Sequence, residues 1–186
     1  MQAPTTQTAA RMILVPVDFS PASDEALQFA LRLAACSSQR LVVLHVVHES
    51  VNGQHYPRKN EKDRILPIDE IAENMLQTFM VDMRARHPGN AVLANAGMMV
   101  VTGLPATRIP EIAHRIGAGL IVMGSNGRSG LAKLLAGSVS EKVARDGRVP
   151  VTIVHANGTV REGDRHEHDK PAIRPADDSA RLYLVS

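Results

Sequence analysis

One glycine-rich stretch has the residue types and spacing needed to hold a phosphate group. Two residues separate Gly124 from Gly127, nine separate Gly127 from Gly137, and Ser138 follows at the start of an amphipathic segment. Glycines let the backbone approach a ligand closely, and consecutive amides in such turns bind anions. A helix beginning at Ser138 would direct free N–H groups at the same anion, and Arg128 adds a fixed charge nearby. The stretch therefore favours a phosphate-binding loop.

Spacing alone leaves a second interpretation open. Glycine-rich turns between a strand and a helix are common, and Ser138 could serve only as a helix cap. The stretch is not a P-loop, because the chain contains no G-x-x-x-x-G-K-[S/T] sequence.

Alternating strands and helices must position this loop. Short apolar runs predict strands at 11–17, 41–47, within 91–101, at 120–123 and at 149–155. Amphipathic stripes predict helices that begin at about 21, 68, 105 and 138, the first of them with Ser20 as cap and Pro21 as first residue. This order predicts an open parallel sheet with helices on both faces. Because the loop follows the fourth strand rather than the first, the usual dinucleotide-binding arrangement is excluded.

Composition indicates a soluble protein with one main domain. The chain has 186 residues, of which 44% are hydrophobic, and its net charge of +2 is too small to indicate nucleic-acid binding. Aromatic residues make up 3% of the chain, which leaves few platforms for stacking on single-stranded nucleic acid. The one cysteine fits a reducing cytosol, and no apolar run is long enough to span a membrane. We therefore expect a cytoplasmic protein with neither nucleic acid nor membrane as a partner.

The domain of 11–155 is flanked by two polar segments. We expect a flexible N-terminus over 1–10 and a mostly flexible tail over 156–186, which holds five basic and six acidic residues. The apolar end of the tail, 182–185, offers the lesser alternative of an edge strand. His166 and His168 make an incomplete ligand set, so we expect no metal site built from protein side chains.

The spacing G-x2-G-x9-G-S resembles the nucleotide-binding signature of the universal stress protein family. The likeness covers about residues 11–155 and includes Ile13-Leu-Val-Pro-Val-Asp18-Phe-Ser20, Leu44-His-Val46, Gly103-Leu-Pro105 and Val149-Pro-Val-Thr-Ile-Val154. The resemblance implies an α/β fold of the Rossmann-like, adenine nucleotide alpha hydrolase-like type. Its five-stranded parallel sheet would have the order 3-2-1-4-5, with a ligand crevice between strands one and four.

The resemblance also implies which residues contact the ligand. Pro16, Val17 and Asp18 correspond to the segment that meets the adenine and ribose, and Val46 to a backbone contact with the adenine ring. The two walls of the phosphate site would be Met123, Gly124 and Gly127 on one side and Gly137, Ser138 and Val139 on the other.

Two of the polar residues in these segments have a structural alternative. Asp18 could instead cap the first helix, although its position and the family pattern favour the ligand role. His45, in an apolar strand, is more typical of a hydrogen-bonded core histidine than of a ligand.

Three functions are compatible with these features. The first is an ATP-binding sensor or regulator of the stress response, with Mg2+ or Mn2+ bridging the phosphates. It would act as a homodimer through the apolar edge of the fifth strand, 149–155, and would signal to an unidentified protein partner. The second is a slow ATP hydrolase or phosphotransferase, for which we find no general base beyond Asp18 and therefore assign no catalytic residue. The third is an interaction scaffold that works without nucleotide.

Overall fold

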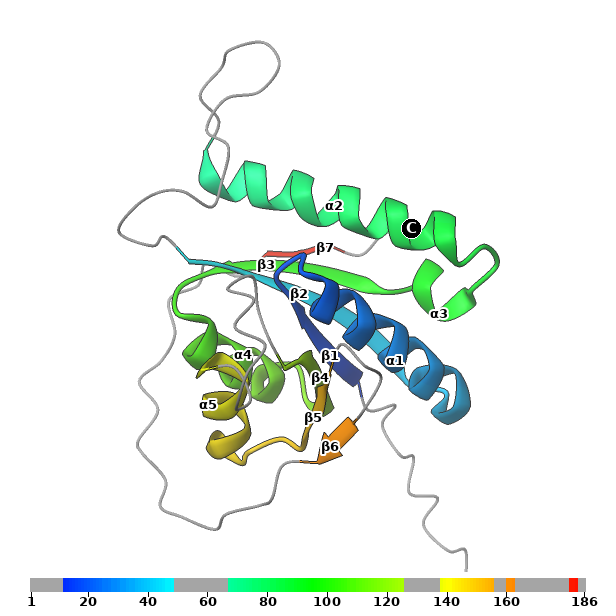
Figure 1. The fold of residues 1–186 in the computed structure, drawn as a ribbon. Helices are drawn as coiled ribbons and strands as arrows, with labels where there is room; N and C mark the ends of the chain where they lie inside the picture. Colours follow the sequence, from blue (N-terminus) through cyan, green and yellow to red (C-terminus); the bar gives the residue numbers. More distant parts are fainter. Residues whose placement is uncertain (1–11, 49–66, 126–137, 156–159, 163–180, 184–186) are drawn as a thin grey trace, which may run out of the picture.

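One β-sheet organises the fold in the computed structural model, which describes residues 12–48, 67–125, 138–155, 160–162 and 181–183 (Figure 1). The five central strands are parallel: β1 (Met12–Val17), β2 (Arg40–Val47), β3 (Gly97–Thr102), β4 (Ala118–Gly124) and β5 (Val151–Val154). Their spatial order is β5-β4-β1-β2-β3. The expected order 3-2-1-4-5 is therefore confirmed.

Helices cover both faces of the sheet (Figure 1). The helices α1 (Pro21–Ser37), α2 (Ile68–Arg86) and α3 (Ala91–Ala94) pack on one face, and α4 (Pro105–Arg115) and α5 (Ser138–Asp146) pack on the other. Successive residues of a strand point to opposite faces, so Val15 joins the cluster under α1 while Leu14 joins the cluster under α4. Both faces are buried, which explains why β2 is apolar along nearly its whole length.

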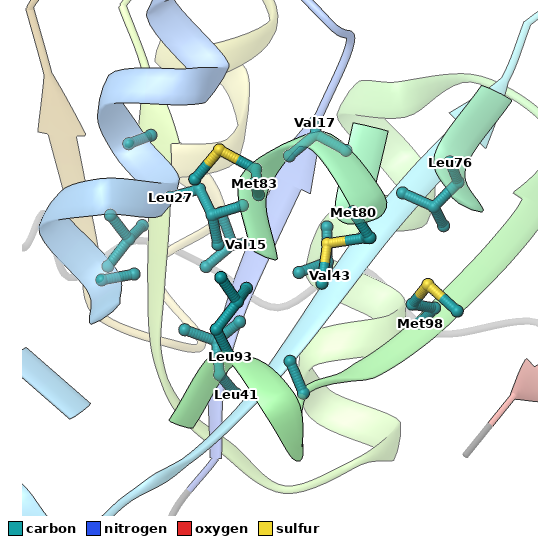
Figure 2. Close-up of a cluster of buried hydrophobic side chains, with 14 of the residues drawn as sticks. Val15, Val17, Leu27, Leu41, Val43, Leu76, Met80, Met83, Leu93 and Met98 are labelled. Carbon is teal, nitrogen blue, oxygen red and sulfur yellow. The ribbon is translucent and has the colours of Figure 1, made fainter. Parts of the chain in front are cut away.

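The core under α1, α2 and α3 is built from aliphatic side chains and methionines (Figure 2). Figure 2 shows Leu27 of α1 and Met83 of α2 beside Val15 of β1, and Met80 of α2 beside Val43 of β2. These side chains and that of Leu93 in α3 are fully buried. Burying a side chain of this size stabilises the folded state by about 1.5–3 kcal/mol. This packing fixes the three helices against the sheet.

The start of α1 is held by a cap and by an ion pair. Ser20 Oγ accepts a hydrogen bond from the Ser23 amide at 3.3 Å, which confirms the cap expected from the sequence. Arg86, at the end of α2, donates to the two carboxylate oxygens of Asp24 at 2.7 and 3.2 Å. These hydrogen bonds raise the pKa of Arg86 and tie the end of α2 to the first turns of α1.

A short helix replaces the beginning of the strand expected within 91–101. Residues 91–94 form α3, because Asn90 Oδ1 accepts a hydrogen bond from the Leu93 amide at 3.0 Å and so caps a helical turn. The strand itself begins at Gly97.

Both edges of the sheet are paired with short antiparallel strands from the tail. β6 (Val160–Glu162) pairs with β5, and β7 (Arg181–Tyr183) pairs with β3. The edge strand considered as the lesser alternative for the end of the tail is therefore present. We expected β5 to have an open apolar edge. In the structure, residues 152–154 of this edge pair with β6.

The structure does not describe residues 1–11, 49–66, 126–137, 156–159, 163–180 and 184–186. The N-terminus and most of the tail, both expected to be flexible, therefore lie outside the described residues. The flexible N-terminus over 1–10 and the flexible character of the tail therefore stay predictions. Within the part of the chain that the structure describes, no helix has the length and apolar character needed to cross a membrane.

Candidate functional site

The candidate site begins where β1 and β4 stop pairing. The backbone pairing of β1 with β4 ends at Leu14 and Ile121. On its other side, β1 stays paired with β2 as far as Val17 and His45, and β4 continues with β5 as far as Gly124. The carboxyl end of β1 is therefore paired only with β2, and that of β4 only with β5. This is the topological switch point at which ligands bind in open α/β sheets.

The turn after β1 carries Asp18 into this region. We call residues 17–20 the Asp18 turn. Asp18 Oδ1 accepts hydrogen bonds from the Ser20 amide at 3.1 Å and from Ser20 Oγ at 2.5 Å. Phe19, between them, has a φ of 63°, a left-handed conformation that is uncommon for a residue with a side chain. Asp18 is thus not itself the cap of α1 but holds Ser20, which is.

Gly124, at the end of β4, lies against the first turn of α1. A Cβ atom added there would be 2.7 Å from the carbonyl carbon and oxygen of Ala22 and 2.8 Å from its Cβ. The first glycine of the motif is therefore required by helix packing, whatever it contributes to a ligand. The close approach brings the N-terminus of α1 to the end of β4.

The N-terminus of α5 meets the same place. Ser140 Oγ donates to the carbonyl oxygen of Ser125 at 3.4 Å, and the Ser125 amide donates to the carbonyl of Val154 at 2.8 Å. Val139, partly buried, packs against the core under α4 and α5. Two helix N-termini, each carrying positive partial charge, therefore converge on the ends of β1 and β4.

Ser125 is a candidate that the sequence interpretation missed. The residue is buried, and its Oγ has no hydrogen-bond partner among the described residues. Buried hydroxyl groups are usually hydrogen-bonded, so a polar ligand group at this point would complete its bonding. The available signal was its position between the first two glycines of the motif, next to Gly124.

The structure brings together the described residues of the expected site. Pro16 and Val17 are buried at the end of β1, and Met123 is buried at the end of β4. Val46 is the first residue of β2 beyond its pairing with β1, as expected of a residue at the edge of a crevice. Ser138 is the first residue of α5. The remaining expected residues, Gly127, Arg128 and Gly137, lie outside the described part of the chain.

No metal-binding cluster accompanies these residues in the described segments. Among residues 12–48, 67–125 and 138–155, no group of three or more histidine, cysteine, aspartate or glutamate side chains is placed to hold a metal ion.

Comparisons with known proteins agree with this architecture. The family model described as the universal stress protein family matches residues 10–155. Universal stress protein YxiE of Bacillus subtilis is 33% identical over 148 residues, which cover 76% of this chain and 97% of that protein. The solved structure of universal stress protein UspA from Lactobacillus plantarum has 25% identity and a TM-score of 0.58, covering 77% of this chain and 97% of that one. A universal stress protein in complex with cAMP has the same fold, with 24% identity, a TM-score of 0.56, and coverage of 80% and 99%.

Proposed function

Because the chain belongs to the universal stress protein family, we propose that it binds an adenine nucleotide at the carboxyl edge of β1 and β4. The observation that carries the proposal is the convergence of the N-termini of α1 and α5 on this edge, with Gly124 of β4 packed against the first turn of α1. An anionic ligand fits two helix N-termini, and the glycine motif of this chain follows β4 directly.

The described residues divide naturally between the two ends of a nucleotide. The base and ribose would lie along the ends of β1 and β2, with the backbone of Val46 beside the base and the carboxylate of Asp18 accepting from ribose hydroxyl groups. The phosphates would lie at the start of α5, near Ser138 and the hydroxyl of Ser125. In this arrangement the triphosphate extends from β1 toward β4 and α5.

We propose ATP as the nucleotide, with Mg2+ or Mn2+ bridging its phosphates. A triphosphate presents the most negative charge to the positive ends of α1 and α5. The cation would be held mainly by phosphate oxygens, since it favours oxygen ligands and a partial water shell. Its chemical contribution would be to neutralise the phosphate charge.

The biological role we propose is that of a cytoplasmic sensor or regulator of the stress response. Nucleotide binding would change the population of conformations around the glycine motif, and a partner protein would recognise the bound state. Bound ATP would then be used for signalling rather than for rapid turnover, because Asp18 is the one residue of the described site with the chemistry of a general base.

We also propose a homodimer through the fifth strand, 149–155, on the family resemblance. β6 pairs with β5 within the chain, so a partner strand would have to replace β6 or add beyond it. Sedimentation of the full chain at micromolar concentration tests this proposal directly. A dimer is expected, and a monomer would contradict it.

The binding proposal is tested by matched carboxylate variants. Asp18→Asn keeps an oxygen that can accept from Ser20, so the turn should stay formed while the negative charge is lost. We expect its ATP affinity to fall about tenfold, which corresponds to the loss of one charge-assisted hydrogen bond. The control is Asp82→Asn on the outer face of α2, where the side chain is 62% exposed.

Fluorescence competition against a labelled ATP analogue measures both variants. Asp82→Asn should bind as the wild type does. Equal affinities for Asp18→Asn and Asp82→Asn would remove Asp18 from the site. Gly127→Val addresses the motif itself and should abolish ATP binding, because a side chain at the second glycine would occupy the phosphate position.

A further inference from the structure

His45 lies at the point where the ladder between β1 and β2 stops. Val17 and His45 form the last backbone pair of these two strands. Beyond it, β1 leaves the sheet in the Asp18 turn, while β2 continues beside β3 through Val46 and Val47. The side chain of His45 is 4% exposed and points to the face covered by α1 and α2. The His45 side chain is therefore placed to contact the Asp18 turn, in which the backbone pairing of β1 with β2 goes no further than Val17.

Where the backbone pairing of β1 with β2 ends, the imidazole of His45 forms a hydrogen bond to β1. His45 Nδ1 lies 2.8 Å from the carbonyl oxygen of Val17. A carbonyl oxygen only accepts hydrogen bonds, so Nδ1 must carry the hydrogen and donate it. This bond fixes the carbonyl that immediately precedes Asp18. In the neutral imidazole, it also determines which of the two ring nitrogens is protonated.

The ring of His45 also supports the strained residue of the turn. The Phe19 ring lies with its centroid 4.4 Å from that of His45 and tilted by 36°. The ring of Phe79 in α2 contacts the Phe19 ring edge-on, with 5.7 Å between the two ring centroids. A non-glycine residue with a φ of 63° persists only where its surroundings hold it, and here the two rings do so.

From these contacts we infer that His45 is a positioning residue of the nucleotide site, acting through the Asp18 turn. Its side chain holds Val17 and Phe19, which lie on either side of Asp18, while its own chain neighbour Val46 borders the base. One residue thus contacts the part of the site on β1 and adjoins the part on β2. The inference rests on the proposed nucleotide site for its functional consequence, but the positioning itself is measurable without ligand.

Three substitutions separate positioning from simple core packing. His45→Asn places an amide N–H on the atom that corresponds to Nδ1, so it can still donate to Val17. His45→Gln moves the amide one carbon further out, and His45→Leu removes the donor. We expect His45→Gln and His45→Leu to bind ATP about five- to tenfold more weakly than the wild type, the equivalent of one hydrogen bond. His45→Asn keeps the donor but loses the ring contact with Phe19, so it should bind more weakly than the wild type and more tightly than those two variants.

Asn90→Ala is the matched control for lost stability. It removes a side chain–backbone hydrogen bond of 3.0 Å at the start of α3, before β3 and therefore at the opposite end of the sheet. Its ATP affinity should equal that of the wild type although its unfolding free energy is lower. The inference would be overturned if His45→Leu bound ATP as tightly as the wild type, or if His45→Asn bound ATP as weakly as His45→Leu.

Two ligand-free readouts keep this test distinct from the test of nucleotide binding. Long-range 15N correlation spectra should show a histidine protonated at Nδ1 whose signal disappears in His45→Asn. Hydrogen exchange of the Ser20 amide, which donates to Asp18 Oδ1 at 3.1 Å, should be slow in the wild type and in His45→Asn. It should be faster in His45→Gln and His45→Leu.

The two possible failures then differ. Unchanged Ser20 exchange in both of those variants would refute positioning even if ATP binds. Absent ATP binding with altered Ser20 exchange would refute the nucleotide site and leave the positioning of the turn intact.

Discussion

Substituting Gly124 by alanine tests how closely α1 approaches the end of β4. The added Cβ would lie 2.7 Å from the backbone carbon and oxygen of Ala22. Apolar contacts are optimal from about 3.5 Å, so the two segments must separate by roughly 0.8 Å. Because the atoms that are met belong to backbone, no side-chain rotation relieves the overlap, and we take the cost as about 2–3 kcal/mol, the upper part of the overpacking range.

The net loss of stability is slightly smaller. Alanine restricts the unfolded chain more than glycine does, and this raises the free energy of unfolding by about 0.4–1 kcal/mol. We therefore expect the free energy of unfolding of Gly124→Ala to be about 2 kcal/mol lower than that of the wild type. In urea, with a denaturant dependence of about 2 kcal/mol per molar, the midpoint would fall by about 1 M.

Gly97→Ala is the matched control for this experiment. Gly97 also lies in a parallel strand, but a Cβ there would be 3.6 Å from Val42 Cγ2 and 3.9 Å from the carbonyl of Leu41, which are ordinary contacts. Its unfolding free energy should be unchanged or higher by up to about 1 kcal/mol. If Gly124→Ala proves as stable as Gly97→Ala, the packing of α1 on β4 is wrong. Weaker ATP binding by Gly124→Ala, in contrast, would not by itself identify a ligand contact.

Further substitutions test backbone strain and the pairing of α1 with α2. Gly103→Ala should lower the unfolding free energy by about 1–3 kcal/mol, because Gly103 has a φ of 132° and a Cβ would lie 2.9 Å from Arg108 Cγ. Gly89→Ala should cost less, about 1 kcal/mol, because its φ is 76° but the added Cβ meets no atom within 4 Å. Arg86→Met removes partly exposed ion pairs with Asp24 and Asp82 and should cost about 0.2–1 kcal/mol for each, with ATP affinity unchanged. Chemical denaturation measures all three, and a cost for Gly89→Ala above that of Gly103→Ala would contradict the strain argument.

The sequence predicts the central sheet well because its signals are local. The apolar run of β2, the Ser20 cap with Pro21 and the start of α5 at Ser138 all depend on residues close together in the chain. The spatial order of the strands came instead from the family resemblance, since periodicity does not specify which strands are neighbours.

The features that the sequence did not predict depend on distant contacts. β6 spans three residues, too few for a pattern, and it forms because the edge of β5 is there to pair with. The apolar end of the tail gave β7 only as the lesser alternative, because its pairing depends on the distant edge of β3. The apolar residues of α3 predict a strand, and the helix is identified only from the hydrogen bond by which Asn90 caps it.

The candidate site shows the same limit. Gly124 was interpreted as a phosphate-binding glycine, and its contact with Ala22, about a hundred residues away in the chain, shows a packing requirement as well. His45 was correctly interpreted as a hydrogen-bonded core histidine. Its partner, the carbonyl of Val17, could not be named, because that contact depends on the register of β1 against β2.

Calorimetric titration of the full-length, nucleotide-stripped protein with ATP in the presence of Mg2+ tests the central claim most directly. We predict saturable binding of about one ATP per chain, since each chain has one junction between β1 and β4. Absence of binding at millimolar ATP would contradict the account. Gly124 would then serve the packing of α1 on β4 alone.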